Sequence, residues 1–234
     1  MTDEERLSDL AAATHFVLLD FDGPVCDLFA NLPADAVAAS VLDELEGMLG
    51  GPVDEDLADI DDPLDLLDGV SEIYPQLLPA VDSAVREAEA DAGALAPLTA
   101  GAVDFLQVCV DSGRRLAIVS NNGAEAVRTV LDLHDLSERV LHVQGRDPDP
   151  RLMKPDPTPL LQAMRALGAD PTRTTMIGDS SSDMLAARAA GIEAIALLEA
   201  APPPATPDAG QAWVAGMDQL AELFRRSEPR TPRR

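Results

Sequence analysis

The sequence predicts an α/β protein in which a doubly wound parallel sheet is joined to a small all-helical domain. Two observations indicate this fold class. Short apolar runs recur along the chain and alternate with segments of helical periodicity, and one long interval after the first run shows helical periodicity alone. The runs are continuously apolar rather than alternating, as expected for strands that helices cover on both faces. With 234 residues, 46% of them apolar, the chain can fill such a core.

The apolar runs are predicted to form the strands of the sheet. They cover residues 15–20, 115–120, 139–143, 174–179 and 192–198, and residues 213–214 are expected to add an edge strand. Helices are predicted at residues 102–112, 124–133, 159–167, 184–190 and 217–226. Three of them are followed by a glycine, the residue that most readily adopts the left-handed backbone conformation common just after a helix. Strands that alternate with helices in this way predict a Rossmann-like core. The proline-rich residues 200–211 are predicted to form a surface loop.

One interval is too long for a single strand–helix unit, which needs about 30 residues. Residues 21–114 separate the first run from the second, and much of this interval shows helical stripes without a strand signal. We therefore expect a catalytic core of residues 1–27 and 98–226, a helical cap of residues 28–97, and a disordered tail of residues 227–234. The stripes contain Val37, Val41, Leu45 and Met48, then Leu77, Val81 and Val85, and Pro63 suits a first helical turn between them.

The charge of the chain restricts its partners. With 42 acidic and 17 basic residues the formal net charge is −25, which repels nucleic acid and anionic lipid surfaces. The acidic N-terminal segment lacks the apolar core of a signal peptide, and no apolar run is long enough to span a membrane. We expect a cytoplasmic protein that binds neither nucleic acid nor membranes. The sequence does not predict an oligomeric state.

Polar residues follow the predicted strands where the carboxyl ends of a parallel sheet meet, which is where ligands bind in this fold class. Lys154 lies in the loop after the third run and is the sole lysine among the 17 basic residues. Because these segments converge on one edge, we expect their side chains to form a single site. The other candidates are Asp20 and Asp22 after the first run, Ser120 and Asn121 after the second, and Asp179 and Asp183 after the fourth.

This set of residue types suits phosphoryl chemistry. Several carboxylates at one edge raise one another's pKa unless a cation lies between them, and Mg²⁺ prefers oxygen ligands and commonly binds a phosphate oxygen as well. Ser120 and Asn121 precede a helix whose N-terminus favours an anion, and Lys154 adds a positive charge. An aspartate can also act as a nucleophile that forms an acyl phosphate. The residues therefore predict a magnesium-dependent site for a small-molecule phosphate ester.

The segments "DFDG", "VSNN", "KPDP" and "GDSSSD" occur in this order at the strand ends. Together they resemble the four motifs of the haloacid dehalogenase superfamily in its phosphatase branch, and the insert after the first motif resembles the helical cap of its phosphoglycolate phosphatase-like members. The resemblance implies that Asp20 is the nucleophile and Asp22 the general acid and base. Ser120 and Lys154 would bind the phosphate, while Asp20, the Asp22 carbonyl and Asp179 would hold magnesium. Asp183 would support the metal shell or Lys154.

Members of the family that this chain resembles also catalyse other reactions, and the sequence argues against some of them. Phosphatases of this family usually have Thr after the first motif, where this chain has Pro24. True dehalogenases lack an acid at the position of Asp22, and phosphonate-cleaving members need a cap lysine that is missing here. Two alternatives stay open: a sugar-phosphate mutase, which uses the same core, and a receiver-like module that accepts phosphate without turnover.

The predicted cap is strongly acidic. Residues 54–68 alone contain eight acidic residues in 15 positions. Such a run is typical of a solvated face that aids solubility. The alternative is that an acidic lid prefers a phosphate ester whose leaving group is cationic, such as an amino sugar or an amino alcohol.

Overall fold

A six-stranded, entirely parallel sheet forms the centre of the molecule, which confirms the predicted fold class. The computed structural model describes residues 3–198 and 212–229. The strand order is β3-β2-β1-β4-β5-β6. Chain order therefore runs outward in one direction from β1 to β3 and in the other from β4 to β6, which opens a crevice at the carboxyl ends of the central strands. The strands are β1 (Phe16–Leu19), β2 (Arg115–Val119), β3 (His142–Gln144), β4 (Thr174–Gly178), β5 (Glu193–Leu197) and β6 (Ala212–Val214).

The third strand begins later than predicted. Residues 139–141 were expected to be extended, but Ser137–Arg139 form a 3₁₀ turn, η1, and the strand starts at His142. Arg139 explains the difference, because its guanidinium donates to the carbonyl of Asp135 at 2.6 Å and to the side chain of Gln107 at 3.1 Å. These contacts hold Arg139 in a turn on the surface, so the prediction was wrong at the start of this strand.

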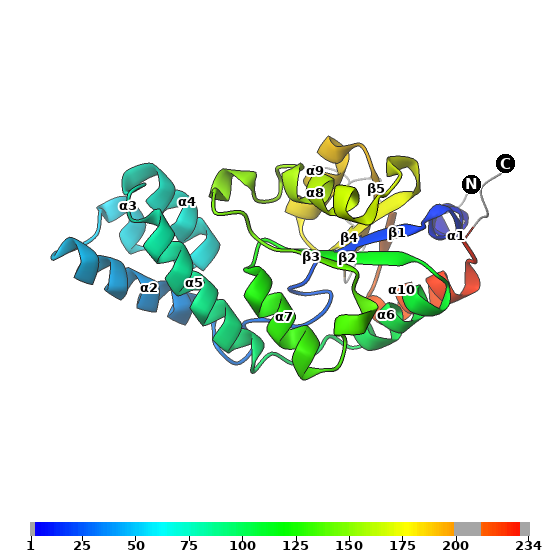
Figure 1. Cartoon of the computed structure of the whole chain (residues 1–234), viewed down its shortest axis with the longest axis horizontal. Coiled ribbons are helices and arrows are strands. Elements are labelled where there is room, and N and C mark those ends of the chain that lie inside the picture. The colour runs from blue at the N-terminus through cyan, green and yellow to red at the C-terminus, as the bar shows by residue number, and fades with distance from the viewer. Residues whose placement is uncertain (1–2, 199–211, 230–234) are drawn as a thin grey trace.

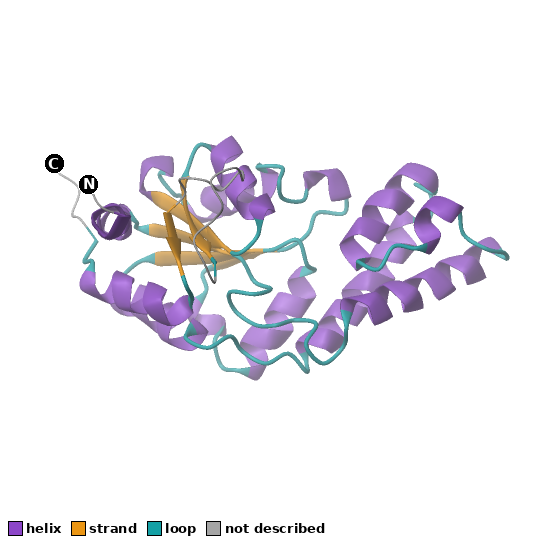
Figure 2. Cartoon of the chain, turned by 180° about the vertical axis from the view of Figure 1, so that it is seen from behind, coloured by secondary structure: helices purple, strands orange, loops and turns teal. Residues whose placement is uncertain are grey.

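Helices cover both faces of the sheet, as Figure 1 and Figure 2 show. Val17 and Leu19 face one hydrophobic core while Leu18 faces the other, so successive residues of β1 are buried on opposite sides. The first face carries α1 (Asp3–Ala13), α6 (Ala102–Asp111), α7 (Ala124–Leu133) and α10 (Met217–Arg226), and the second carries α8 (Thr158–Leu167) and α9 (Ser181–Ala190). Short 3₁₀ turns, η2 (Pro150–Leu152) and η3 (Pro171–Arg173), lead into α8 and β4.

Two helices differ from the prediction. The sequence did not predict α1, whose N-terminal residues are acidic and polar. Helix α9 begins at Ser181, three residues before the predicted start at residue 184. Ser180 caps this helix and Asp183 completes the capping box, so these polar residues belong to its first turn rather than to a loop.

The insert after the first strand is entirely helical within the described residues and lies to one side of the sheet (Figure 1). Its helices bury a hydrophobic core of their own, which includes Val41, Leu45, Leu66 and Val85. Helix α5 is the long element that runs from this core back to α7. The division into a core and a cap at residues 28–97 stays a prediction. The helices are α2 (Ala34–Leu49), α3 (Glu55–Ala58), α4 (Pro63–Ile73) and α5 (Leu78–Gly93).

A buried arginine, Arg114, forms hydrogen bonds with both ends of the described chain. The guanidinium of Arg114 donates to the carbonyls of Ala11 and Thr14 beside α1, and to those of Phe224 and Ser227 at the end of α10. Ser227 is therefore buried and bonded, so the predicted disordered tail does not begin there. Residues 230–234 of that tail and the predicted loop at residues 200–211 lie outside the described residues. Among the described helices, none has the length and apolar character needed to cross a bilayer.

Candidate active site

A cavity of about 570 Å³ lies at the carboxyl ends of β1, β2 and β4, between the sheet and the helical insert. The predicted site residues line the sheet side of the cavity, with the exception of Asp183. The side chain of Asp183 is buried and does not line the cavity. The insert side contributes Phe29, Asp62, Pro63 and Leu64. The predicted residues that line it are Asp20, Asp22, Ser120, Asn121, Lys154 and Asp179.

Asp20 directly follows β1 and contacts the buried ammonium group of Lys154. The Nζ atom of Lys154 lies 2.7 Å from Asp20 Oδ1 and 2.6 Å from Asp183 Oδ1. Burial alone would lower the pKa of Lys154, but the carboxylates of Asp183 and Asp20 outweigh it and raise that pKa, so the lysine stays charged. Burial and the charge of Asp183 raise the pKa of Asp20 well above its usual value despite the lysine. One cation thus serves two carboxylates in this cluster.

Asp183 acts as the fixed partner of Lys154. One of its oxygens accepts from Lys154, and the other accepts from the hydroxyl of Ser180 at 2.7 Å. Its side chain is fully buried. Gly178 leaves room for this approach, since a Cβ atom there would come within 2.2 Å of Asp183 Oδ2. Asp183 is therefore better placed to hold the lysine than to offer a free oxygen to the cavity.

Asp22 faces the cavity from the turn after β1. Its Oδ1 atom accepts from the main-chain N–H of Leu28 at 2.8 Å, which fixes the direction of the carboxylate. Burial raises the pKa of Asp22, and the charges of Asp27 and Asp62 raise it further. A carboxyl group that holds its proton more tightly than usual is suited to donate a proton to a leaving group.

Pro24 lacks the side-chain hydroxyl and the backbone N–H that a threonine would supply at this position, and other contacts close the turn around it. Gly23 has a φ of +95° and its N–H donates to the Cys26 carbonyl at 2.7 Å. The hydroxyl of Thr99, which also lines the cavity, donates to the Gly23 carbonyl at 2.5 Å. A Cβ atom on Gly23 would lie 1.9 Å from Asp179 Oδ2, so only glycine lets the turn approach that carboxylate. Thr99 thus supplies a hydroxyl to this turn from a distant part of the chain.

The loop after β2 carries the polar groups predicted to bind phosphate. The Ser120 hydroxyl donates to Asn122 Oδ1 at 3.1 Å, and the Asn122 N–H donates back to Ser120 Oγ at 3.0 Å. The side chain of Asn121 instead bonds the main chain of Lys154 in both directions, at 2.8 Å and 3.0 Å. Asn121 therefore positions Lys154 with its side chain, and its carbonyl accepts from Arg146, so phosphate binding by Asn121 stays a prediction.

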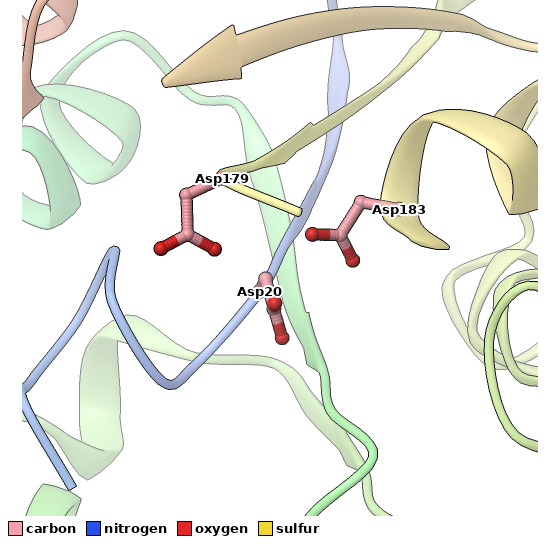
Figure 3. Close-up of side chains that lie close together, drawn as sticks. All are labelled: Asp20, Asp179 and Asp183. Carbon is pink, nitrogen blue, oxygen red and sulfur yellow. The ribbon is translucent and has the colours of Figure 1, made fainter. Parts of the chain in front are cut away.

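Three carboxylates cluster closely enough to surround a divalent cation. One oxygen of each of Asp20, Asp179 and Asp183 lies within 4.8 Å of the others. Because both oxygens of Asp183 already accept hydrogen bonds, Asp20 and Asp179 are the two that could bind the ion directly. Figure 3 shows the three carboxylates converging from the ends of β1 and β4 and the first turn of α9. Burial, and after it the charge of Asp183, raise the pKa of Asp179 to about 6, so a cation beside this carboxylate would favour its ionised form. An all-oxygen donor set of this kind suits a hard cation such as Mg²⁺.

Sequence reasoning missed several cavity residues. Ser180 had a usable signal, because Ser followed three residues later by Asp is a capping-box pattern. Thr99 and Asp62 carry no motif of their own, and their place at the cavity follows from how the insert packs. Two buried residues beside the site, Glu89 and Arg146, also escaped the prediction.

Comparison with known proteins identifies relatives of this chain. The family model described as haloacid dehalogenase-like hydrolase matches residues 43–197. A phosphoglycolate phosphatase 1 of Pseudomonas aeruginosa is 37% identical over 111 residues, which are 47% of this chain and 40% of that protein. A phosphoglycolate phosphatase of Pseudomonas putida is 30% identical over 82% of this chain and 64% of its own length. The chain thus aligns with less than two thirds of either relative.

A solved structure shows the same fold over most of both chains. The crystal structure of CbbY from Rhodobacter sphaeroides in complex with phosphate has a TM-score of 0.62 and 20% identity, and the match covers 88% of this chain and 96% of that one. At this identity the likeness concerns the fold. The family model covers more than half of the sequence, and its match includes the segments that contribute Ser120, Lys154 and Asp179. The chain therefore belongs to the haloacid dehalogenase-like hydrolase family.

Proposed function

We propose that this protein is a magnesium-dependent phosphatase that hydrolyses a small phosphate ester through a phospho-aspartate formed on Asp20. One observation carries the proposal. Asp20 follows β1 directly, and its carboxylate lies 2.7 Å from the ammonium group of Lys154 in a cavity that Asp22, Ser120 and Asp179 also line. A nucleophile, a proton donor, a phosphate-binding hydroxyl and a cation site thus share one cavity, which is the set that phosphoryl transfer requires.

In the first step, an oxygen of Asp20 attacks the phosphorus atom and the bond between phosphorus and the leaving oxygen breaks. Asp22, whose pKa is raised, gives its proton to that oxygen, so the alcohol leaves neutral. In the second step, the Asp22 carboxylate takes a proton from water and the water oxygen attacks the same phosphorus. The bond to Asp20 then breaks, and both aspartates return to their starting state with inorganic phosphate as the product.

Asp20 and Asp179 would hold the magnesium ion, with the Asp22 carbonyl as the further ligand that the family resemblance implies. When bound, the ion supplies positive charge to the phosphate oxygens and relieves the repulsion between carboxylates. Lys154 and the Ser120 hydroxyl orient the phosphate from the other strand ends. The insert, whose residues Phe29 and Leu64 close one side of the cavity, would exclude bulk water.

The direct test is phosphate release from an aryl phosphate, measured with magnesium and with a chelator. We expect turnover that depends on magnesium and disappears in the Asp20→Asn variant. Isomerisation of a sugar phosphate without net phosphate release would instead support a mutase. Stable phosphorylation of Asp20 without turnover would support a phosphate-accepting module.

The charge of the cavity favours a particular kind of leaving group. Asp27 and Asp62 face it in addition to the carboxylates of the sheet, and Lys154 is the sole cationic side chain among the described lining residues. Glycolate carries a carboxylate, so phosphoglycolate would meet negative charge and lack an arginine to bind it. We propose that the substrate leaves as a neutral or cationic alcohol, unlike the substrate in the names of the two Pseudomonas relatives.

A substrate panel at low ionic strength tests this second proposal. Phosphoethanolamine and an amino-sugar phosphate are expected to exceed phosphoglycolate in kcat/KM, and added salt should narrow the difference because it screens the carboxylates. Asp27→Asn should also reduce the difference in kcat/KM between these substrates, since it removes a negative charge that is exposed at the cavity. Preference for phosphoglycolate would contradict the proposal on the leaving group while leaving the phosphatase proposal intact.

A further inference from the structure

Helix α5 of the insert carries a carboxylate, Glu89, into the loop that follows β2. Glu89 is fully buried, and its oxygens accept hydrogen bonds from three donors of the sheet domain. Oε1 accepts from the Asn122 amide at 3.1 Å and from Arg146 at 2.7 Å, and Oε2 accepts from the main-chain N–H of Gly123 at 2.8 Å. A single side chain of the insert therefore satisfies donors at the start of α7, next to Ser120.

Asn122 links Glu89 to Ser120. A carboxylate only accepts hydrogen bonds, so the contact with Glu89 fixes which end of the Asn122 amide faces α5. The opposite end then accepts from the Ser120 hydroxyl, and the Asn122 N–H donates to the same hydroxyl oxygen. The position of the Ser120 hydroxyl thus depends on a residue whose orientation Glu89 sets.

A second buried residue ties the same loop to α5. Arg146 follows β3, its side chain is 1% exposed, and it donates to Glu89, to the Asn121 carbonyl at 3.0 Å and to Asp82 at 2.9 Å. Arg86 donates to Asp82 at 2.7 Å and to the Arg146 carbonyl at 2.9 Å. Two arginines thus balance two carboxylates, which makes their burial tolerable.

The two carboxylates of this group, Glu89 and Asp82, differ in the residues they contact. Glu89 accepts from Asn122 and Gly123 of the loop, whereas the side chain of Asp82 accepts from the two arginines. Both carboxylates neutralise Arg146, so charge balance alone would make them equivalent. Contact with the loop distinguishes them, and it gives a pair of residues that can be compared directly.

We infer that Glu89 is a positioning residue for phosphate binding, and that the helical insert thereby forms part of the phosphate site and is more than its lid. The inference rests on the proposed function, because it assumes that the loop from Ser120 to Gly123 binds phosphate. Glu89 is not expected to touch the substrate. It acts by orienting Asn122 and by accepting from the Gly123 N–H. A glutamine in its place can donate as well as accept, so the Asn122 amide could adopt the opposite orientation, with its nitrogen and oxygen exchanged.

The test compares Glu89→Gln with Asp82→Asn as a matched control, since each removes one negative charge from Arg146. Binding of inorganic phosphate in the presence of magnesium is measured by calorimetry, and stability by thermal unfolding. We expect both variants to lose thermal stability, while Glu89→Gln alone weakens phosphate binding by about tenfold, the effect of one lost hydrogen bond to a charged group. Asp82→Asn should stay within about twofold of wild type.

Wild-type phosphate affinity in Glu89→Gln, or equal losses in both variants, would overturn the inference. If Glu89→Gln does not fold, Glu89→Asp keeps the charge but shortens the side chain, and it should weaken phosphate binding while Arg146 stays paired. Unchanged affinity in that variant would also overturn the inference. A wild-type protein that binds no phosphate would overturn the proposed function as well, so the two failures are distinguishable.

Discussion

The ammonium group of Lys154 lies 2.6 Å from the carboxylate of Asp183, and both side chains are buried behind the proposed nucleophile. Asp183 therefore fixes the sole lysine of the chain where it can meet both Asp20 and a phosphate group. This pair explains why an arginine-rich sequence keeps one lysine, because a compact ammonium group fits between two carboxylates more readily than a planar guanidinium.

Replacing Lys154 with Met should damage both stability and activity. Asp20 and Asp183 would be left buried without their cation, which should lower the free energy of unfolding by about 3 kcal/mol. Loss of a charge that binds the phosphate should lower kcat/KM by about 10²-fold or more. Urea unfolding and steady-state kinetics measure the two effects. Arg151→Met is the control: Arg151 is exposed and forms a surface ion pair with Asp149, so the change in the free energy of unfolding should fall within about 0.5 kcal/mol.

Replacing Asp20 with Asn should abolish turnover without unfolding the protein. The nucleophilic carboxylate is lost, so kcat should fall by about 10⁴-fold or more. Burial and Asp183 already raise the pKa of Asp20, which means that its charge is costly in the fold, and a neutral residue should leave thermal stability equal or higher. The control is Asp27→Asn: Asp27 is an exposed neighbour at the cavity, and this variant should retain turnover of an aryl phosphate whose aryl group is uncharged. Substantial activity in Asp20→Asn would contradict the phospho-aspartate mechanism.

Replacing Asp22 with Asn should separate the two chemical steps. The amide oxygen can still accept from the Leu28 N–H, so the side chain should keep its direction. An aryl phosphate has a leaving group that needs no proton, and the first step should continue, whereas attack by water loses its base. Stopped-flow absorbance should then show a burst of about one equivalent of phenolate followed by slow turnover. Slow release of phenolate without a burst would argue against the assignment of the proton to Asp22.

Much of the fold and of the site could be predicted from the sequence, because patterns among neighbouring residues specify the strands and the residues that follow them. The continuous apolar run before Asp20 and the run before Asp179 mark central strands, and parallel strands must bring their carboxyl ends to one edge. Patterns of this kind involve neighbours in the sequence.

The contacts that escaped prediction join residues far apart in the chain. Arg146 bonds Glu89 and Asp82, which lie 57 and 64 positions away, and no motif marks any of them. Thr99 reaches Gly23 across 76 positions. These pairs depend on how α5 packs against α7 and on where the insert returns to the sheet, which no local propensity specifies. The same holds for Asp62, whose charge reaches Asp22 only in the folded structure.

Replacing Asp179 with Asn should stabilise the protein without magnesium and remove its response to magnesium. Burial and Asp183 raise the pKa of Asp179 to about 6, so its ionised form is disfavoured in the fold, and at pH 8 the amide should add stability. The side chain is exposed to the cavity, so solvent screening limits the gain to about 1 kcal/mol. Wild-type protein should gain melting temperature on addition of magnesium, since a ligand that binds only the folded state stabilises it. Differential scanning calorimetry with a chelator and then with magnesium measures both effects, and Asp170→Asn, an exposed carboxylate away from the cavity, is the control. An undiminished magnesium response in Asp179→Asn would show that the cation binds elsewhere.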